Sequence, residues 1–86
     1  MGKQLYSKRR EIVRTLLRDI RTSAELTQKQ VSSRLKRHQS FVSDYERGHR
    51  RLDFVGIEEV LSACGSKMES FVKEYQKRVH QMTDHS

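Results

Sequence analysis

Two neighbouring segments decide the fold of this chain, LTQKQVSSRL at residues 26–35 and QSFVSDYERG at residues 39–48. In the first segment Thr27 is followed three residues later by Gln30, which is the spacing of a capping box. In such a box the threonine hydroxyl accepts from an amide of the first turn, and the glutamine side chain accepts from the threonine amide. The first segment is therefore predicted to be a short helix that begins at Gln28.

The apolar side chains of this helix and the next predict which faces they bury. Val31 and Leu35 share one side of the first helix, which ends near Leu35, and Ser32 is small enough to let another helix approach closely. The second helix is expected over residues 39–47, with Gly48 as a left-handed C-cap. A short helix, a three-residue turn and a second helix with a polar start predict a helix-turn-helix, whose second helix enters the DNA major groove.

Further helices are predicted on both sides of this motif. Apolar residues spaced by three and four predict a helix over about residues 7–24, with its first residue, a serine, as N-cap. Asp53 caps a fourth helix that ends at Gly65, and Ser66 with Glu69 forms a second capping box that opens a fifth helix. No alternating apolar and polar run of strand length remains, so the predicted fold class is all-α.

The two segments resemble the phage repressor and Cro helix-turn-helix family, known as XRE. Leu-Thr-Gln at residues 26–28 and Glu-Arg-Gly at residues 46–48 carry the resemblance, which extends over about residues 14–71. It implies a five-helix, lambda-repressor-like DNA-binding domain with the helix-turn-helix at its second and third helices. In that family an Arg near the end of the first helix pairs with the Glu that ends the third, so Arg21 and Glu46 are expected to form a structural salt bridge.

The turn between the two helices departs from the family pattern. The family turn usually has Gly followed by an apolar residue, whereas this chain has Lys36 followed by Arg37. A residue other than Gly costs about 1–2 kcal/mol in the left-handed conformation, which a domain can tolerate. We therefore expect the turn to form, with the added charges beside the DNA backbone.

The resemblance also implies which side chains contact DNA. The predicted base-reading residues, at the groove-facing positions of the third helix, are Gln39, Ser40, Ser43 and Asp44. Gln can bond adenine with two hydrogen bonds, Ser is permissive, and Asp can accept from the cytosine amine. The predicted phosphate contacts match or adjoin positions that touch the DNA backbone in the family, and they are Gln28, Lys36, Arg37, His38, Arg47, His49, Arg50 and Arg51.

The charge distribution supports a polyanionic partner. The chain holds 18 Lys and Arg against 11 Asp and Glu, a net charge of +7. Residues 1–51 carry fourteen of these basic residues and five of the acidic ones, whereas residues 52–86 carry four and six. This excess of positive charge favours a polyanionic partner, either double-stranded DNA or an anionic membrane surface. DNA is preferred because the helix-turn-helix core needs the apolar stripe of the basic first helix, which a membrane would otherwise have to bind.

Other classes of protein are not expected. A domain of 86 residues buries too small a core for a deep catalytic cleft, and no phosphate-binding loop, glycine-rich elbow or pair of catalytic carboxylates is present. We therefore predict no enzyme and no cofactor. No metal site is expected either, because the histidines are scattered, at His38, His49, His80 and His85. With no apolar run of bilayer length, no signal peptide and a single cysteine, Cys64, a cytoplasmic protein is predicted.

The sequence predicts one domain over residues 1–86, divided into a flexible arm (1–6), a core (7–72) and a C-terminal helical extension (73–86). The extension carries apolar residues at coiled-coil spacing. Three of them, Tyr75, Val79 and Met82, are expected to bury against a second copy of the chain. The alternative is that this tail only extends the core of its own chain or frays.

The chain is predicted to be a transcription regulator that binds double-stranded DNA sequence-specifically. Its expected form is a homodimeric repressor that binds a palindromic operator. Its two recognition helices would lie about 34 Å apart, one helical turn of DNA. The position of the operator decides between repression and activation. The alternative is an antitoxin-like or other protein-interaction module in which DNA binding is secondary, since the same apolar strip would serve a protein partner.

Overall fold

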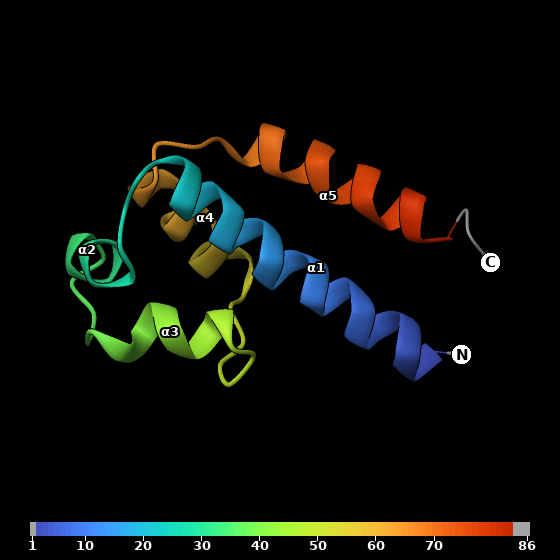
Figure 1. Ribbon diagram of the computed structural model, residues 1–86, viewed down its shortest axis with the longest axis horizontal. Helices are drawn as coiled ribbons and strands as arrows, with labels where there is room; N and C mark the ends of the chain where they lie inside the picture. Colours follow the sequence, from blue (N-terminus) through green and yellow to red (C-terminus); the bar gives the residue numbers. More distant parts are fainter. Residues whose placement is uncertain (1, 84–86) are drawn as a thin grey trace.

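The computed structural model describes residues 2–83, and within them the fold is all-α, as the sequence predicted. Its five helices are α1 (Gly2–Ser23), α2 (Gln28–Arg34), α3 (Ser40–Glu46), α4 (Phe54–Ala63) and α5 (Met68–Thr83). The long helices α1 and α5 lie side by side and antiparallel, and α2, α3 and α4 gather at the C-terminal end of α1 (Figure 1). This arrangement leaves α3 at the edge of the molecule, where a long ligand can reach it.

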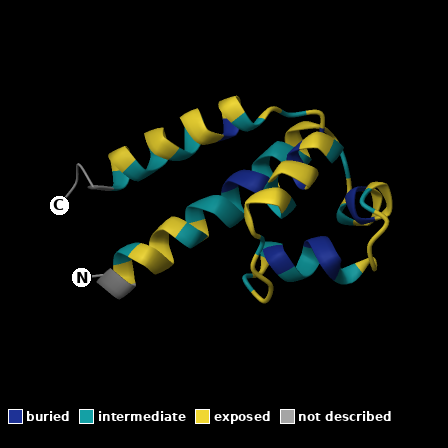
Figure 2. Ribbon diagram, turned by 180° about the vertical axis from the view of Figure 1, so that it is seen from behind, coloured by how far each residue is buried: buried dark blue, intermediate teal, exposed yellow. Residues whose placement is uncertain are grey.

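The core forms where the C-terminal half of α1 meets the other four helices (Figure 2). Its largest fully buried side chains are Tyr45, Leu17, Leu61, Val31, Val42 and Val60. The rings of Phe41 and Tyr45 pack edge to face, with centroids 5.6 Å apart. Burial raises the pKa of the Cys64 thiol, so this cysteine is a small apolar core residue at neutral pH.

The capping residues expected for α2 and α4 are present. The Gln30 N–H donates to Thr27 Oγ1 (3.0 Å) and the Thr27 N–H donates to Gln30 Oε1 (2.8 Å), which completes the capping box. At α4 the Gly56 N–H donates to Asp53 Oδ1 (2.7 Å). These side chains satisfy amides that have no partner within the helix, so they fix where each helix starts.

The expected start of the first helix is wrong. Helix α1 begins at Gly2, so residues 2–6 are helical rather than an arm, and Ser7 lies inside the helix instead of capping it. Tyr6 stabilises the added turn because its ring lies 5.9 Å from the guanidinium carbon of Arg10, four residues on, and 6.0 Å from that of Arg51. Met1 lies outside the described residues.

The capping box expected at the fifth helix is also not formed. Helix α5 begins at Met68, and its first bond runs from the Phe71 N–H to the Lys67 carbonyl (3.1 Å). Ser66 therefore lies before the cap position of α5. Its N–H instead helps to close α4 by donating to the Leu61 carbonyl (2.8 Å).

The first four helices end in the same way. In each, two amides past the C-cap donate back to the last turn, and the first of these residues has a positive φ. Glycine occupies this position after α3 and α4, as Gly48 (φ 83°) and Gly65 (φ 74°), but Glu25 (60°) and Lys36 (56°) hold it after α1 and α2. The turn of the motif thus forms with Lys36 in the left-handed conformation.

The described part of the C-terminal extension packs on α1 of its own chain. Arg78 of α5 donates to Asp19 Oδ2 of α1 (3.1 Å) and to Glu74 Oε2 (3.0 Å). Tyr75 packs against the core, and Val79 and Met82 are half-buried. Residues 84–86 lie outside the described part. Within it, no helix is long and apolar enough to cross a membrane.

The strain at Lys36 gives a first prediction. We expect the Lys36→Gly variant to be more stable than the Lys36→Ala variant by about 1 kcal/mol in free energy of unfolding, because only glycine adopts a positive φ without cost. At the exposed Lys77 in the middle of α5 the order should be reversed, with glycine less stable than alanine by about 1 kcal/mol. Urea unfolding of the four variants measures both differences, and the same order at both positions would contradict strain at Lys36.

Candidate nucleic-acid interface

Helix α3 turns one face to the core and the opposite face outward. Its buried residues are Phe41, Val42 and Tyr45. The predicted base readers lie on the other side, with Gln39 exposed at the N-cap position and Ser40, Ser43 and Asp44 half-buried on the helix. The periodicity of the helix therefore brings these four predicted residues together on one surface.

Neighbouring residues, and not Gln39, satisfy the first amides of α3. The Ser40 N–H donates to His38 Nδ1 (3.2 Å), and the Phe41 N–H donates to the His38 carbonyl (2.9 Å). The Val42 N–H donates to Ser32 Oγ of α2 (3.3 Å), whose hydroxyl reaches the Gln39 carbonyl (3.4 Å). The Gln39 side chain makes no cap hydrogen bond, so its amide is free to bond outside the protein.

Four polar groups join α1, α2 and α3 in one network. Arg21 Nε donates to Glu46 Oε2 (2.7 Å) and Arg21 Nη2 to Glu46 Oε1 (3.1 Å), the ion pair that the sequence predicted. Arg21 Nη1 also donates to the Leu26 carbonyl (2.8 Å), and Gln28 Nε2 donates to Glu46 Oε1 (2.8 Å). The hydrogen bonds to Glu46 raise the pKa of Arg21 further above its ordinary value. The network fixes the end of α3 against the start of α2.

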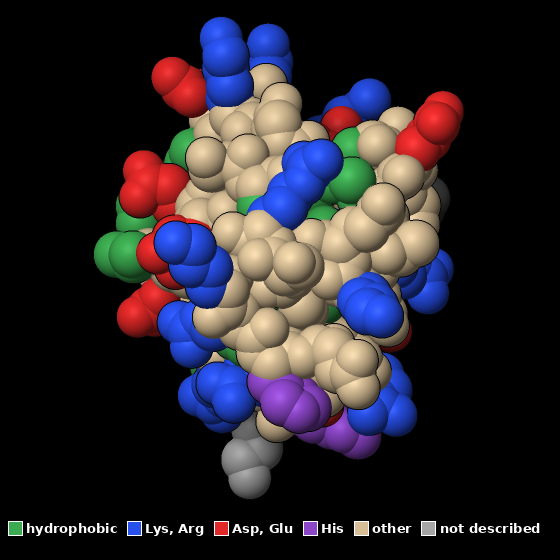
Figure 3. Space-filling view, turned by 90° about the vertical axis from the view of Figure 1, so that its left-hand side faces the viewer, with side chains coloured by type: hydrophobic (Ala, Val, Ile, Leu, Met, Phe, Trp, Pro, Cys, Tyr) green, Lys and Arg blue, Asp and Glu red, His purple; other side chains and the backbone are tan. Residues whose placement is uncertain are grey.

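Basic side chains border the outward face of α3. Arg37 and Arg50 lie over the ring of Phe41, with guanidinium carbons 4.9 and 5.2 Å from its centroid. Most predicted phosphate contacts are exposed, namely Lys36, Arg37, His38, Arg47, His49, Arg50 and Arg51. Figure 3 views the molecule from the end where α2 and the start of α3 lie, with His at its lower edge, Lys and Arg around it, and acidic side chains gathered along its left edge.

Three predicted contacts have additional or different surroundings. Gln28 is half-buried, and its bond to Glu46 makes it first a structural residue. His38 uses Nδ1 to accept from Ser40, which places the proton of the neutral ring on Nε2. Asp44 Oδ1 lies 3.8 Å from Arg47 Nη2, a partly exposed ion pair on the outward face of α3.

The sequence analysis missed two polar residues that position α3. Ser32 was expected only to permit close packing, but its buried hydroxyl bonds the start of α3. Arg34 Nη1 donates to the Ala63 carbonyl at the end of α4 (2.8 Å), which ties α2 to α4. A serine on the apolar side of a helix was a usable signal, because buried hydroxyls almost always have partners. Arg34 had no comparable signal.

No group of three or more His, Cys, Asp or Glu side chains within the described residues is arranged to hold a metal ion. His38 and His49 lie beside the α3 face, whereas His80 lies on α5. His85 lies outside the described residues. The arrangement around α3 is thus one of hydrogen-bonding and positively charged groups, which is the chemistry that recognises nucleic acid.

Comparison with known proteins agrees with this geometry. A family model described as a helix-turn-helix domain matches residues 13–69. The structure of an XRE-family like protein from Pseudomonas syringae pv. tomato str. DC3000 aligns with a TM-score of 0.84 and 30% identity, over 90% of this chain and 94% of that one. The chain belongs to the XRE helix-turn-helix family. It is a DNA-binding transcription regulator by fold and family.

A second solved structure shares the fold of this XRE protein. The wild-type restriction-modification controller protein C.Esp1396I aligns with a TM-score of 0.77 and 18% identity, over 83% of this chain and 93% of that one. No curated protein matches the sequence. The fold of this chain is thus shared with both solved structures over most of its length.

The ion pair of this XRE protein gives a second prediction. We expect Glu46→Gln to lower the free energy of unfolding by about 3 kcal/mol, because Arg21 keeps a charge that is largely buried. Combining Glu46→Gln with Arg21→Met should cost less than the sum of the two single changes. Urea unfolding measures the cycle.

The exposed pair on α3 is the matched control. Side chains of Arg47 and Asp44 are 63% and 31% exposed, against 11% and 4% for Arg21 and Glu46. Asp44→Asn should therefore cost less than about 1 kcal/mol. Equal losses for Asp44→Asn and Glu46→Gln would contradict a central role for the Arg21–Glu46 pair.

Proposed function

We propose that this protein is a homodimeric repressor that reads a palindromic operator in double-stranded DNA, in the cytoplasm. The observation that carries the proposal is the outward face of α3, where polar side chains able to hydrogen-bond are bordered by exposed basic residues. Repression needs only that the operator overlaps a promoter, so that the bound protein excludes the polymerase.

The proposed base readers are Gln39, Ser40, Ser43 and Asp44. Of the four, Gln39 discriminates most strongly between bases, because it is exposed and its amide can form hydrogen bonds with adenine N6 and N7 at the same time. Ser40 and Ser43 accept or donate and so discriminate less. Asp44 can accept from a cytosine amine, with Arg47 beside it reducing the repulsion between its carboxylate and the DNA backbone.

The proposed phosphate contacts supply affinity rather than specificity. Arg37 and Arg50 are held in place by Phe41, so they lose little side-chain freedom when they bind phosphate. Gln28 retains a second amide hydrogen after its bond to Glu46. The remaining members of this set are Lys36, His38, Arg47, His49 and Arg51, all exposed.

The short recognition helix is the argument for a dimer. Three or four side chains of such a helix reach base edges, and each specific contact discriminates by about 1–3 kcal/mol. One copy of α3 therefore reads too few base pairs to select an operator, and two copies on a two-fold axis double the readout.

Exposed apolar side chains support one site for the proposed contact between the two copies. Phe54 and Val55 at the start of α4 are 67% and 58% exposed. Tyr75, Val79 and Met82, the contact proposed from sequence, are already half-covered by their own chain. The contact around Phe54 and Val55 is favoured, and the α5 strip is the second candidate.

Gln39 gives the test of base reading. The operator is first selected from a random duplex pool at about 150 mM salt. We expect Gln39→Ala to lose about ten- to a hundredfold discrimination at one base pair of each half-site, with nonspecific affinity unchanged. The matched control is Gln76→Ala on exposed α5, which should change neither.

Arg37 gives the contrasting result. Arg37→Gln should weaken binding to every duplex alike and reduce the slope of log affinity against log salt by about one.

A uniform loss of affinity with Gln39→Ala would remove Gln39 from the base readers. If no operator sequence were selected at all, the protein-interaction module would become the first hypothesis.

The dimer is tested by sedimentation of the native chain and two variants. We expect two chains per particle, and Phe54→Ser should raise the dimer dissociation constant at least about tenfold, since an apolar contact is lost. Val79→Ser should leave it within about twofold, because Val79 packs on its own chain. The opposite pattern would place the contact on α5, and a native monomer that binds DNA singly would overturn the dimer.

A further inference from the structure

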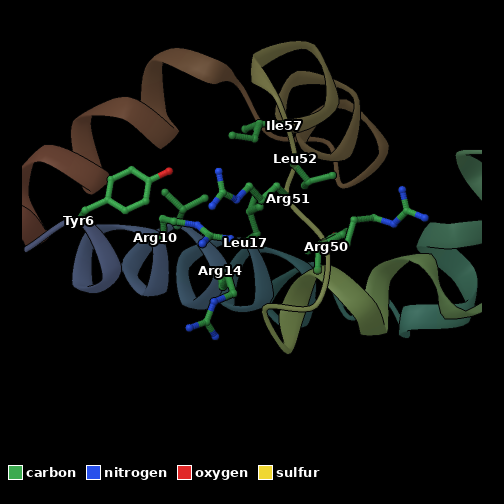
Figure 4. A pocket seen from close by; sticks show the side chains of 10 residues that line it. Tyr6, Arg10, Arg14, Leu17, Arg50, Arg51, Leu52 and Ile57 are labelled. Carbon is green, nitrogen blue, oxygen red and sulfur yellow. The ribbon is translucent and has the colours of Figure 1, made fainter. Parts of the chain in front are cut away.

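A pocket of about 180 Å³ lies between α1, the segment 47–53 and α4 (Figure 4). Its inner wall is largely apolar and includes Val13, Leu17, Tyr45, Leu52 and Ile57. The Tyr45 hydroxyl is buried and has no hydrogen-bond partner in the described part of the chain. A buried hydroxyl without a partner is uncommon, and here it belongs to a residue that lines a pocket.

Two arginines supply the charge of this pocket. The guanidinium carbons of Arg10 and Arg51 lie 5.9 and 6.0 Å from the centroid of the Tyr6 ring. Figure 4 shows both groups between Tyr6 on one side and Leu52 and Ile57 on the other. Neither arginine forms a salt bridge with any residue that the structure describes.

The other two lining arginines are directed elsewhere. Figure 4 shows Arg50 extending away toward α3, where it lies over Phe41. Arg14 packs against the backbone at Gly48, where an added Cβ would lie 3.2 Å from Arg14 Nε. The pocket therefore presents two uncompensated cations, one aromatic ring and an apolar inner wall.

We propose that this pocket binds a small aromatic monocarboxylate. A cavity of about 150 Å³ accommodates benzene, so the volume suits one ring with a short substituent. The planar guanidinium groups of Arg10 and Arg51 match a carboxylate in two-point hydrogen bonding. The ring of the ligand packs against the apolar wall. An inorganic anion would leave that wall uncovered, and a sugar would place unpaired hydroxyls against it.

Binding of such a ligand affects DNA binding, a consequence that rests on the proposed function. Arg51 is a proposed phosphate contact, and a carboxylate at Arg51 removes one positive charge from the DNA-facing surface. By thermodynamic linkage, the ligand weakens duplex binding and the duplex weakens ligand binding by the same factor. The pocket would then sense a small metabolite of this chemical class.

The site is tested with benzoate as the probe and amide chemical shifts of the full chain as the readout. We expect saturable shifts at the amides of Leu17, Arg51 and Leu52. Arg10→Gln should raise the dissociation constant about tenfold or more, since a charge-assisted hydrogen bond is lost. Arg9→Gln, the same change at the preceding exposed residue outside the pocket, should leave it within about twofold.

Two further probes separate the parts of the ligand. Benzyl alcohol keeps the ring without the charge, and acetate keeps the charge without the ring, so each should bind about tenfold more weakly than benzoate. Non-saturating benzoate shifts, equal effects of Arg9→Gln and Arg10→Gln, or equal binding of acetate would overturn the site. Thermal unfolding of each variant shows whether it is folded.

Duplex binding with and without saturating benzoate tests the link separately. A several-fold loss of duplex affinity that Arg10→Gln abolishes supports the link. Saturable benzoate binding with unchanged duplex affinity supports the site and overturns the link. Saturable benzoate binding by a chain that binds no duplex overturns the proposed function and leaves the site supported.

Discussion

The position of the recognition helix depends on the ion pair between Arg21 and Glu46. Helix α3 has only seven residues, and a helix of that length is not stable alone, so its direction is set by what holds its two ends. At its C-terminal end Glu46 receives three hydrogen bonds, two from Arg21 and one from Gln28. At its N-terminal end Ser32 bonds Val42. Polar contacts between helices therefore orient the outward face of α3.

The chain reversals add a second constraint, which is met at some cost. The first four helices end with two backward amide bonds and one residue at positive φ, yet only two of these residues are glycines. Glycine at Gly48 also allows Arg14 to approach the backbone. Lys36 adopts a strained, left-handed conformation at the turn before α3, where its side chain adds an exposed positive charge.

Local signals predicted most of the fold, and contacts between distant segments explain what they missed. The capping box of Thr27 and Gln30 and the cap at Asp53 depend on residues within one turn, so the sequence was sufficient. The start of α1 depends on Tyr6 meeting Arg51, forty-five residues away, and Ser66 is committed to closing α4. The family resemblance supplied the four residues on the outer face of α3. The pocket arises where α1, α4 and the segment between α3 and α4 meet, which no local pattern describes.

Residues 47–53 connect the proposed ligand pocket with the outward face of α3. Consecutive arginines of this segment point to different places, Arg50 to Phe41 on α3 and Arg51 to Tyr6 over the pocket. Arg51 therefore covers the pocket while Arg50, next to it in the chain, belongs to the basic border of α3. The same short connection also carries Gly48, which ends α3, and Asp53, which starts α4. Its backbone is held at both ends, so occupancy of the pocket acts on the arginine side chains between them.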